Sequence, residues 1–184
     1  MIFTGVGSRE INQTGINRII EVASILQKTG AILRSGGADG SDQAFESCFL
    51  KEEQKEIYLP WKNAFNNSSA FCFVGKEAMA LAATIHPVFD RLKPGAQKLH
   101  ARNCYQVLGW SLKNKSDILI CWTKDGAVCE KETTSKTGGT RTAIVLADRM
   151  GVPVFNLNKD TSYDTLMGML LKRQFYYNSI KISF

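Results

Sequence analysis

The sequence predicts a Rossmann-like α/β fold, with a doubly wound and mainly parallel sheet that carries helices on both faces. Short apolar runs alternate along the chain with segments in which apolar residues recur at helical spacing. Glycine-rich turns lie between such a run and the next helical segment. Strands that alternate with helices at this spacing favour crossover connections and a parallel sheet.

The elements follow one another in a regular order. The expected strands cover residues 1–5, 30–35, 56–61, 117–122 and 152–157. The expected helices cover residues 16–28, 41–48, 76–85, 96–113, 142–150 and 163–173.

Local signals set most of these boundaries. Apolar residues recur three or four positions apart over 16–28, which indicates one buried helix face. Gly5 ends the first expected strand, and Pro60 closes the third. Pro94 and Gly95 are expected to separate two helices.

Two further segments have a recognisable strand pattern. The run from Ile118 to Trp122 is apolar throughout, which is typical of a strand buried on both faces of a sheet. The tail over 180–184 alternates like an edge strand. Together with the aromatic run 175–177, this tail is expected to pack on its own domain, with packing on another subunit as the alternative.

Length and composition fit one globular domain over residues 1–184. The chain has 184 residues, of which 44% are hydrophobic and 22% charged, and this length suffices for one substantial core. No apolar run approaches the length that crosses a bilayer, and no charged signal-peptide head precedes the first strand. We expect a cytoplasmic protein without a membrane partner.

The cysteines and histidines do not indicate a metal. The five cysteines are odd in number and contain no CxxC pair, so neither a disulfide framework nor a zinc cluster is predicted. The two histidines, His86 and His100, lie far apart in the sequence. We expect no structural metal and no cofactor.

The charge favours anionic partners. The formal net charge is +6 and the sequence pI is about 9.1, which suits the phosphates of a small ligand or the backbone of a nucleic acid. Basic residues are mildly enriched over 91–115, where a solvated basic face is the alternative to a binding surface.

Three glycine-rich turns form the expected binding site, at residues 5–9, 35–42 and 137–142. Glycine allows a tight turn and lets a ligand approach the backbone N–H groups, and a helix N-terminus attracts phosphate. A plain connection between strand and helix is the alternative role of any single turn. Neither the GxGxxG fingerprint nor the Gly-Lys-Ser/Thr of a P-loop is present, which disfavours a dinucleotide dehydrogenase or a P-loop NTPase.

The segments GVGSRE, LRSGGADGSDQAFE, HARN, SDILICW and GGTRTAIVLADRMGVPVF, in that order, resemble the SLOG superfamily over most of residues 1–157. That superfamily includes the "lonely guy" phosphoribohydrolases, the DNA-processing protein A that loads recombinase on single strands, and sensor domains for ADP-ribose derivatives. The resemblance implies a Rossmann-like fold and a nucleotide-type ligand. SGGADGSD and GGTRT are most similar to the DNA-processing branch and to small stand-alone members of phages and bacteria.

The hydrolase members carry a PGGxGTxxE motif and an upstream arginine in an HxRK-like helix segment. The matching residues are Gly138, Gly139 and Thr142 in the motif and His100 and Arg102 in the helix segment. Arg141 stands where the motif has a glycine, and Val145 stands where it has the catalytic glutamate. Without that carboxylate the chain lacks the group expected to act during N-glycosidic cleavage, although Asp39, Asp42 or Asp148 are alternative carboxylates.

The residues that we expect to contact the ligand are Gly7, Ser8, Arg9, Ser35, Gly36, Gly37, Asp39, Arg102, Gly138, Gly139, Thr140, Arg141 and Thr142. Arg9 is expected to pair with a phosphate, and Asp39 to hydrogen-bond a ribose hydroxyl. Asp42 is expected either to cap its helix or to touch the ligand. Trp61 and Trp122 end strands, where core packing is favoured over base stacking.

The leading functional hypothesis is a sensor or sequestering protein that binds a nucleotide-derived signalling molecule, ADP-ribose-like or cyclic, with no catalytic residues. One alternative is a nucleoside 5′-monophosphate phosphoribohydrolase. A second alternative is a single-stranded DNA-binding recombination mediator, although the sequence shows no continuous basic stripe. The expected partner is a small nucleotide-type ligand with a phosphate; a nucleic acid is not favoured, and the sequence leaves open whether the chain forms a homo-oligomer.

Overall fold

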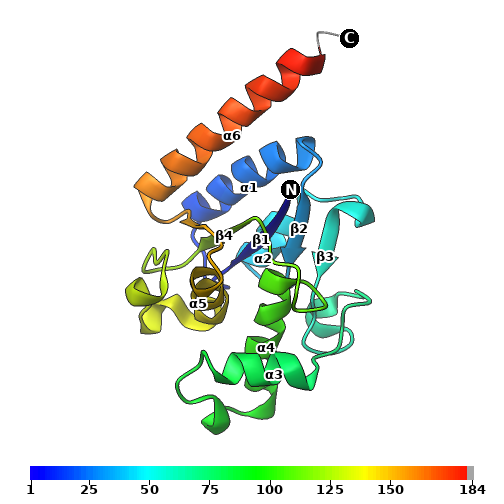
Figure 1. Cartoon of the computed structure of the whole chain (residues 1–184), viewed down its shortest axis with the longest axis vertical. Helices are drawn as coiled ribbons and strands as arrows, with labels where there is room; N and C mark the ends of the chain where they lie inside the picture. Colours follow the sequence, from blue (N-terminus) through cyan, green and yellow to red (C-terminus); the bar gives the residue numbers. More distant parts are fainter. Residues whose placement is uncertain (182–184) are drawn as a thin grey trace.

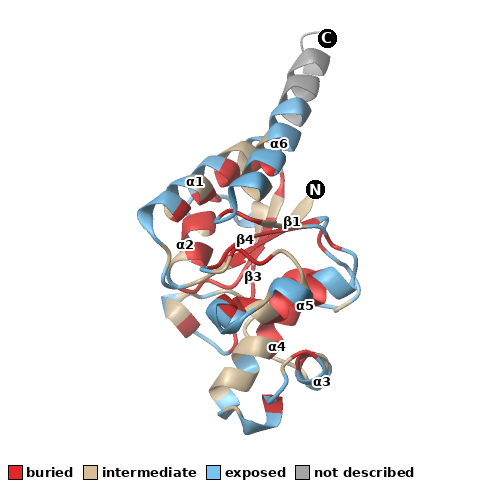
Figure 2. Cartoon of the chain, turned by 90° about the vertical axis from the view of Figure 1, so that its left-hand side faces the viewer, coloured by how far each residue is buried: buried red, intermediate tan, exposed pale blue. Residues whose placement is uncertain are grey.

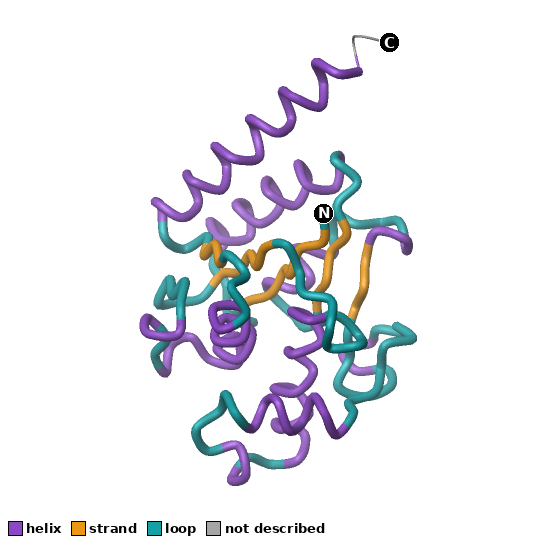
Figure 3. Tube along the Cα trace, viewed as in Figure 1, coloured by secondary structure: helices purple, strands orange, loops and turns teal. Residues whose placement is uncertain are grey.

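The structure is a computed structural model that describes residues 1–181, with side chains described through residue 172. Within that part, one parallel sheet has the strand order β3-β2-β1-β4-β5. The strands are β1 (Ile2–Gly7), β2 (Ile32–Ser35), β3 (Lys55–Ile57), β4 (Ile118–Trp122) and β5 (Val154–Asn156). Figure 3 shows them side by side between two helical layers, which confirms the predicted α/β class.

Helices cover both faces of the sheet (Figure 1). They are α1 (Gln13–Lys28), α2 (Ser41–Glu46), α3 (Lys76–Ala83), α4 (Pro94–Leu108), α5 (Arg141–Arg149) and α6 (Asp160–Lys181). Helices α1 and α6 pack on one face, and α4 and α5 pack on the other, where α3 packs against α4. No helix in the described part of the chain is both long enough and apolar enough to cross a membrane.

Strand β4 explains the apolar run in the sequence. Ile118, Ile120 and Trp122 belong to the core on the α1 side of the sheet, whereas Leu119 and Cys121 belong to the core on the α4 side. Successive side chains alternate between the faces of a strand, so both faces must be apolar when helices cover both. Figure 2 shows the strands as mostly buried between the helical layers.

Strand β1 continues past Gly5 to Gly7, so the expected end of the strand at Gly5 was wrong. A Cβ atom at Gly5 would lie 2.7 Å from Leu33 Cδ1 and 2.8 Å from Phe45 Cγ. The glycine therefore leaves room for packing inside the sheet and does not break the strand.

The two helices are separate, as predicted, but Pro94 and Gly95 begin the second helix and do not lie between the two. Pro94 occupies the first turn of α4, where its missing N–H is not needed for the helix ladder. The helix ends at Leu108, earlier than the sequence predicted, because Gly109 follows with a φ of 69°.

The C-terminal tail differs from the expected edge strand. Helix α6 runs through Lys181, so Ile180 and Lys181 are helical. No glycine or proline stands between residues 173 and 181 to stop the helix. The rest of the expected strand, residues 182–184, and the packing of the aromatic run 175–177 lie outside what the structure describes.

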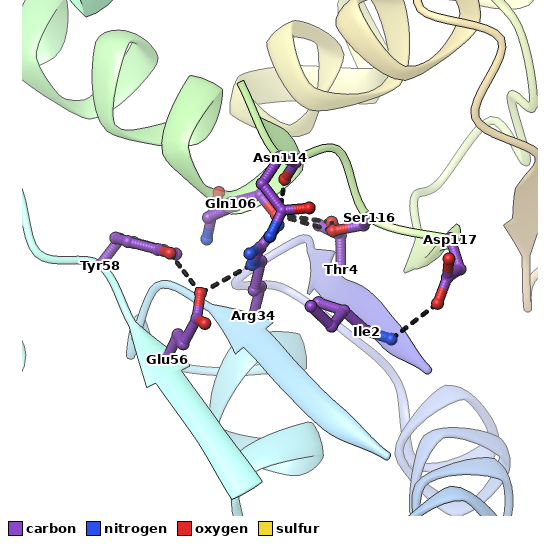
Figure 4. A network of polar contacts seen from close by, with 9 residues as sticks. All are labelled: Ile2, Thr4, Arg34, Glu56, Tyr58, Gln106, Asn114, Ser116 and Asp117. Carbon is purple, nitrogen blue, oxygen red and sulfur yellow. Dashed lines mark hydrogen bonds and ion pairs between the residues drawn. The ribbon is translucent and has the colours of Figure 1, made fainter. Parts of the chain in front are cut away.

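A polar network fastens the end of α4 to the sheet (Figure 4). Thr4 Oγ1 donates to the Gln106 carbonyl oxygen at 2.6 Å. Buried Arg34 pairs with Glu56 at 2.7 Å and donates to the Asn114 carbonyl oxygen at 2.5 Å. These contacts bind α4 and the segment after it to β1 and β2, which orients the polar face of the helix.

Candidate functional site

A cleft of about 560 Å³ opens at the carboxyl end of β1, beside β4. The chain crosses from one side of the sheet to the other between these two strands, and ligands bind at such switch points in open α/β sheets. The polar residues that line the cleft are Ser8, Arg9, Glu10, Asp42, His100, Arg102, Asn103, Gln106, Lys124, Ser135, Lys136, Thr137 and Thr140.

Arg102 supplies a buried positive charge to this cleft. Its side chain comes from α4, is only 4% exposed, and places Nη1 3.5 Å from Asp42 Oδ2. With its amide oxygen turned toward the guanidinium, Gln106 accepts from Arg102 Nη1 at 2.8 Å and from the Gly36 backbone N–H at 2.9 Å. The Nε atom of Arg102 is buried and has no hydrogen-bond partner among the described residues.

Gly36 makes room for that guanidinium. A Cβ atom at position 36 would lie 1.0 Å from Arg102 Nη1 and 2.2 Å from its Cζ. Any side chain at this position would therefore occupy the space of the arginine. The glycine in the turn after β2 serves the placement of Arg102 and does not line the cleft.

Burial and the ion pair have opposite effects on the pKa values of Asp42 and Arg102. Burial raises the pKa of Asp42, and the adjacent guanidinium opposes that shift. Burial also lowers the pKa of Arg102, and Asp42 opposes this change. Asp42 does not cap α2, because the cap residue is Gly40 and no side-chain cap hydrogen bond is present.

Two contacts join α4 to the first turn of α5 and to the glycine turn before it. His100 Nδ1 lies 2.7 Å from Thr142 Oγ1, and Asn103 Nδ2 donates to the Gly139 carbonyl oxygen at 2.9 Å. Burial lowers the pKa of His100 to about 4, with smaller contributions from His86 and Arg102. His100 is therefore neutral at pH 7 and acts in this structure as a hydrogen-bonding partner.

The loop before α5 is organised by one carboxylate. Asp125 accepts from the hydroxyl of Thr123 at 2.7 Å, of Thr134 at 2.7 Å and of Thr137 at 2.5 Å. Burial opposes the shift, but these hydrogen bonds lower the pKa of Asp125 to about 2. They hold the backbone in place where it reaches Gly138, which has a φ of 62°.

The mouth of the cleft is cationic. Arg9 and Lys136 are both exposed there, and no carboxylate among the described side chains forms an ion pair with either of them. Lys124 pairs with Glu10 at 2.5 Å, so these two charges offset each other. The unpaired cations favour an anionic ligand.

The cleft brings together about half of the residues expected to contact the ligand. Those that line it are Gly7, Ser8, Arg9, Arg102, Gly138, Gly139 and Thr140. Those that do not line it are Ser35, Gly36, Gly37, Asp39, Arg141 and Thr142.

The residues outside the lining have other partners. Ser35 is buried and donates to the Gly5 carbonyl oxygen at 2.7 Å. A Cβ at Gly37 would lie 3.2 Å from Asn67 Nδ2, on the side away from the cleft residues. Exposed Asp39 accepts from Gln43 Nε2 at 3.0 Å, and Arg141 Nε donates to Thr133 Oγ1 at 3.1 Å.

Two tryptophans and one valine that the sequence singled out differ in how deeply they are buried. Trp122 is 4% exposed and belongs to the core, as favoured. Core packing was the wrong prediction for Trp61, which is 43% exposed and lies beyond the end of β3 at Ile57. Val145, which stands at the position of the hydrolase glutamate, lies on the buried face of α5 and belongs to the core. In the described part of the chain, no three His, Cys, Asp or Glu side chains gather to hold a metal ion.

The sequence did not identify several of the residues that line the cleft. Asn103 and Gln106 stand three and six positions after His100, on the same face of α4. A polar stripe at this spacing on an otherwise buried helix is a usable signal. Lys124 and Lys136 lie in a long polar loop, where nothing local distinguishes them from solvated lysines.

The fold and the cleft define a Rossmann-like α/β protein with a cationic cleft at the switch point of its sheet. Among solved structures the chain is similar to DNA processing protein A from Helicobacter pylori, described for its unique single-stranded DNA binding mode. The TM-score is 0.54 with 18% identity, over 100% of this chain and 81% of that chain. No protein family and no curated protein matches the chain. The likeness establishes a shared fold alone.

Proposed function

We propose that the cleft binds a nucleotide through its phosphate and returns it unchanged, as a sensor or sequestering protein does. The observation that carries this proposal is the buried guanidinium of Arg102, whose Nε lacks a hydrogen-bond partner. Buried polar groups are nearly always hydrogen-bonded, so an orphaned donor on a charged group beside a cleft calls for a ligand. A phosphate oxygen supplies both the acceptor and the opposite charge.

The rest of the cleft supports an anionic group near Arg102. Gly138 and Gly139 are exposed and stand just before Thr140, the N-cap residue of α5, which is a helix of nine residues. The backbone there approaches a ligand without an intervening side chain, and the helix N-terminus favours negative charge. Lys136 adds an exposed cation to the same wall.

Both carboxylates that line the cleft are already engaged in ion pairs, which favours binding without cleavage. Asp42 is buried against Arg102, and Glu10 pairs with Lys124 at the surface. Val145 is in the core and offers no polar atom. Cleavage of an N-glycosidic bond requires a group that responds to charge developing in the transition state, whereas binding requires only donors and cations.

The test uses adenosine 5′-monophosphate and titration calorimetry with Arg102→Lys, which keeps the charge beside Asp42 but removes the Nε–H donor. We expect about 10-fold weaker binding, in line with the loss of a hydrogen bond to a charged group. Arg149→Lys is the matched control, since Arg149 lies on α5 and pairs with Glu130 outside the cleft. Equal affinity of Arg102→Lys and the parent protein would contradict the proposal.

The same complex tests turnover. The protein is saturated with the nucleotide, held for hours, denatured, and the released small molecules are identified by mass spectrometry. Intact nucleotide is the expected result. Free base or ribose 5-phosphate in excess over protein would instead establish the phosphoribohydrolase alternative.

A second candidate function is single-stranded DNA binding. The observation that favours it is the fold likeness to DNA processing protein A, for which such binding is described. The exposed cations Arg9 and Lys136 fit a phosphate backbone as well as a small ligand. Fluorescence anisotropy of a labelled oligothymidylate distinguishes the two, because affinity for a strand falls log-linearly with salt.

A further inference from the structure

An aromatic ring lies against the arginines of the cleft. The Cζ atom of Arg9 lies over the Phe65 ring at 5.2 Å from its centroid, and that of Arg102 lies 5.9 Å from the same centroid. Both distances fall within the range of about 6 Å for cation–π contact. Phe65 itself does not line the cleft, so it supports the arginines from behind.

The backbone around Phe65 adopts an uncommon conformation. Asn63, Phe65 and Asn66 have φ angles of 58°, 57° and 56°. The left-handed region is unusual for a bulky residue such as phenylalanine and costs roughly 1 kcal/mol or more where it persists. Ala64, between them, is buried in a small cluster with Ile57 and Leu59, on which Phe65 also packs. The surrounding contacts therefore hold the ring in place beside Arg9.

Arg9 is backed by an aromatic ring and is accessible from the cleft. Its side chain is exposed and lines the cleft, and its Cζ atom lies over the Phe65 ring. A phosphate contacts the N–H groups at the edge of a guanidinium, whereas a flat ring stacks on its face. Nucleobases commonly stack on arginine planes as well as on aromatic side chains.

We infer that Arg9, backed by Phe65, is the base-stacking platform of the cleft. The inference rests on the proposed function and specifies its ligand: the phosphate lies at Arg102 and the turn at Gly138 and Gly139, and the base lies on the outer face of Arg9. The cleft volume of about 560 Å³ is within the range that holds a ligand of this size. The preferred ligand is then a base-bearing nucleotide and not a sugar phosphate.

The experiment compares adenosine 5′-monophosphate with ribose 5-phosphate, which carries the same phosphate and no base. The parent protein should bind the nucleotide about 5- to 150-fold more tightly, the range expected for stacking of one base. Arg9→Lys keeps the charge and removes the flat face, so it should lower nucleotide affinity toward that of ribose 5-phosphate. Phe65→Leu should lower nucleotide affinity about 2- to 5-fold. Each substitution should lower ribose 5-phosphate affinity less than nucleotide affinity, because ribose 5-phosphate has no base to stack.

Phe73→Leu is the matched control, since Phe73 is 67% exposed and lies outside the cleft lining. Arg9 is exposed, so Arg9→Lys tests the inference even if Phe65→Leu alters the loop. Equal affinity of the parent protein for both ligands, or equal losses for both in Arg9→Lys, would overturn the stacking role and leave the phosphate site intact. Failure of both ligands to bind the parent protein would overturn the proposed function itself.

Discussion

Replacement of Gly36 by alanine should break the polar core of the candidate site. The new methyl carbon would lie 1.0 Å from Arg102 Nη1 and 2.5 Å from the side-chain amide of Gln106, so the guanidinium must leave its position. Asp42 would then remain buried without its partner, because it is only 4% exposed. Removal of one partner of a buried ion pair destabilises a protein by about 3–5 kcal/mol.

The measurement is the free energy of unfolding in urea, followed by tryptophan fluorescence. A loss of this size corresponds to a fall in Tm of roughly 6–20 °C for a chain of this length. Gly139→Ala is the matched control, since no atom lies within 4 Å of a Cβ at that position and the residue does not have a positive φ. The control should unfold within about 0.5 kcal/mol of the parent protein.

A double-mutant cycle identifies the cause. In an Arg102→Ala background the space beside Gly36 is free, so the further change Gly36→Ala should have little effect on stability. Additive losses would show that the clash with Arg102 is not the reason. A Gly36→Ala protein as stable as the parent would refute the placement of the guanidinium over this glycine.

Three further predictions concern the rest of the cleft. Gly139→Val should keep its stability but lose binding of adenosine 5′-monophosphate in calorimetry, because a branched side chain fills the space before α5; unchanged affinity would make this turn a mere connector. The folded-state pKa of His100, about 4, is below its ordinary value of 6.5. Stability from this group is therefore full above pH 6.5 and is lost as the pH falls toward 4; His100→Gln should reduce the difference between urea midpoints at pH 7 and pH 5. Asp125→Asn should cost about 1.5–3 kcal/mol in urea unfolding, because its new amide would face the donors of Thr134 and Thr137; a neutral effect would contradict the assigned network.

The sequence determined the class of fold and the end of the sheet at which the site lies. The period of apolar residues distinguishes strands from helices, and it depends only on local geometry. The apolar run from Ile118 to Trp122 showed in addition that helices cover both faces of the sheet. Gly7 at the end of β1 and the glycines ahead of α5 marked the end of the sheet where the cleft is found.

Tertiary structure alone decided what each glycine and each charge does. Gly5, Gly36 and Gly139 are alike in the sequence, yet one makes room in the sheet, one makes room for Arg102, and one borders open space. The pairs Arg102 with Asp42, His100 with Thr142 and Arg9 with Phe65 join segments far apart in the chain. Local patterns contain no information about which distant side chain packs against a position, because burial and contact arise only when helices and strands are assembled around a common core.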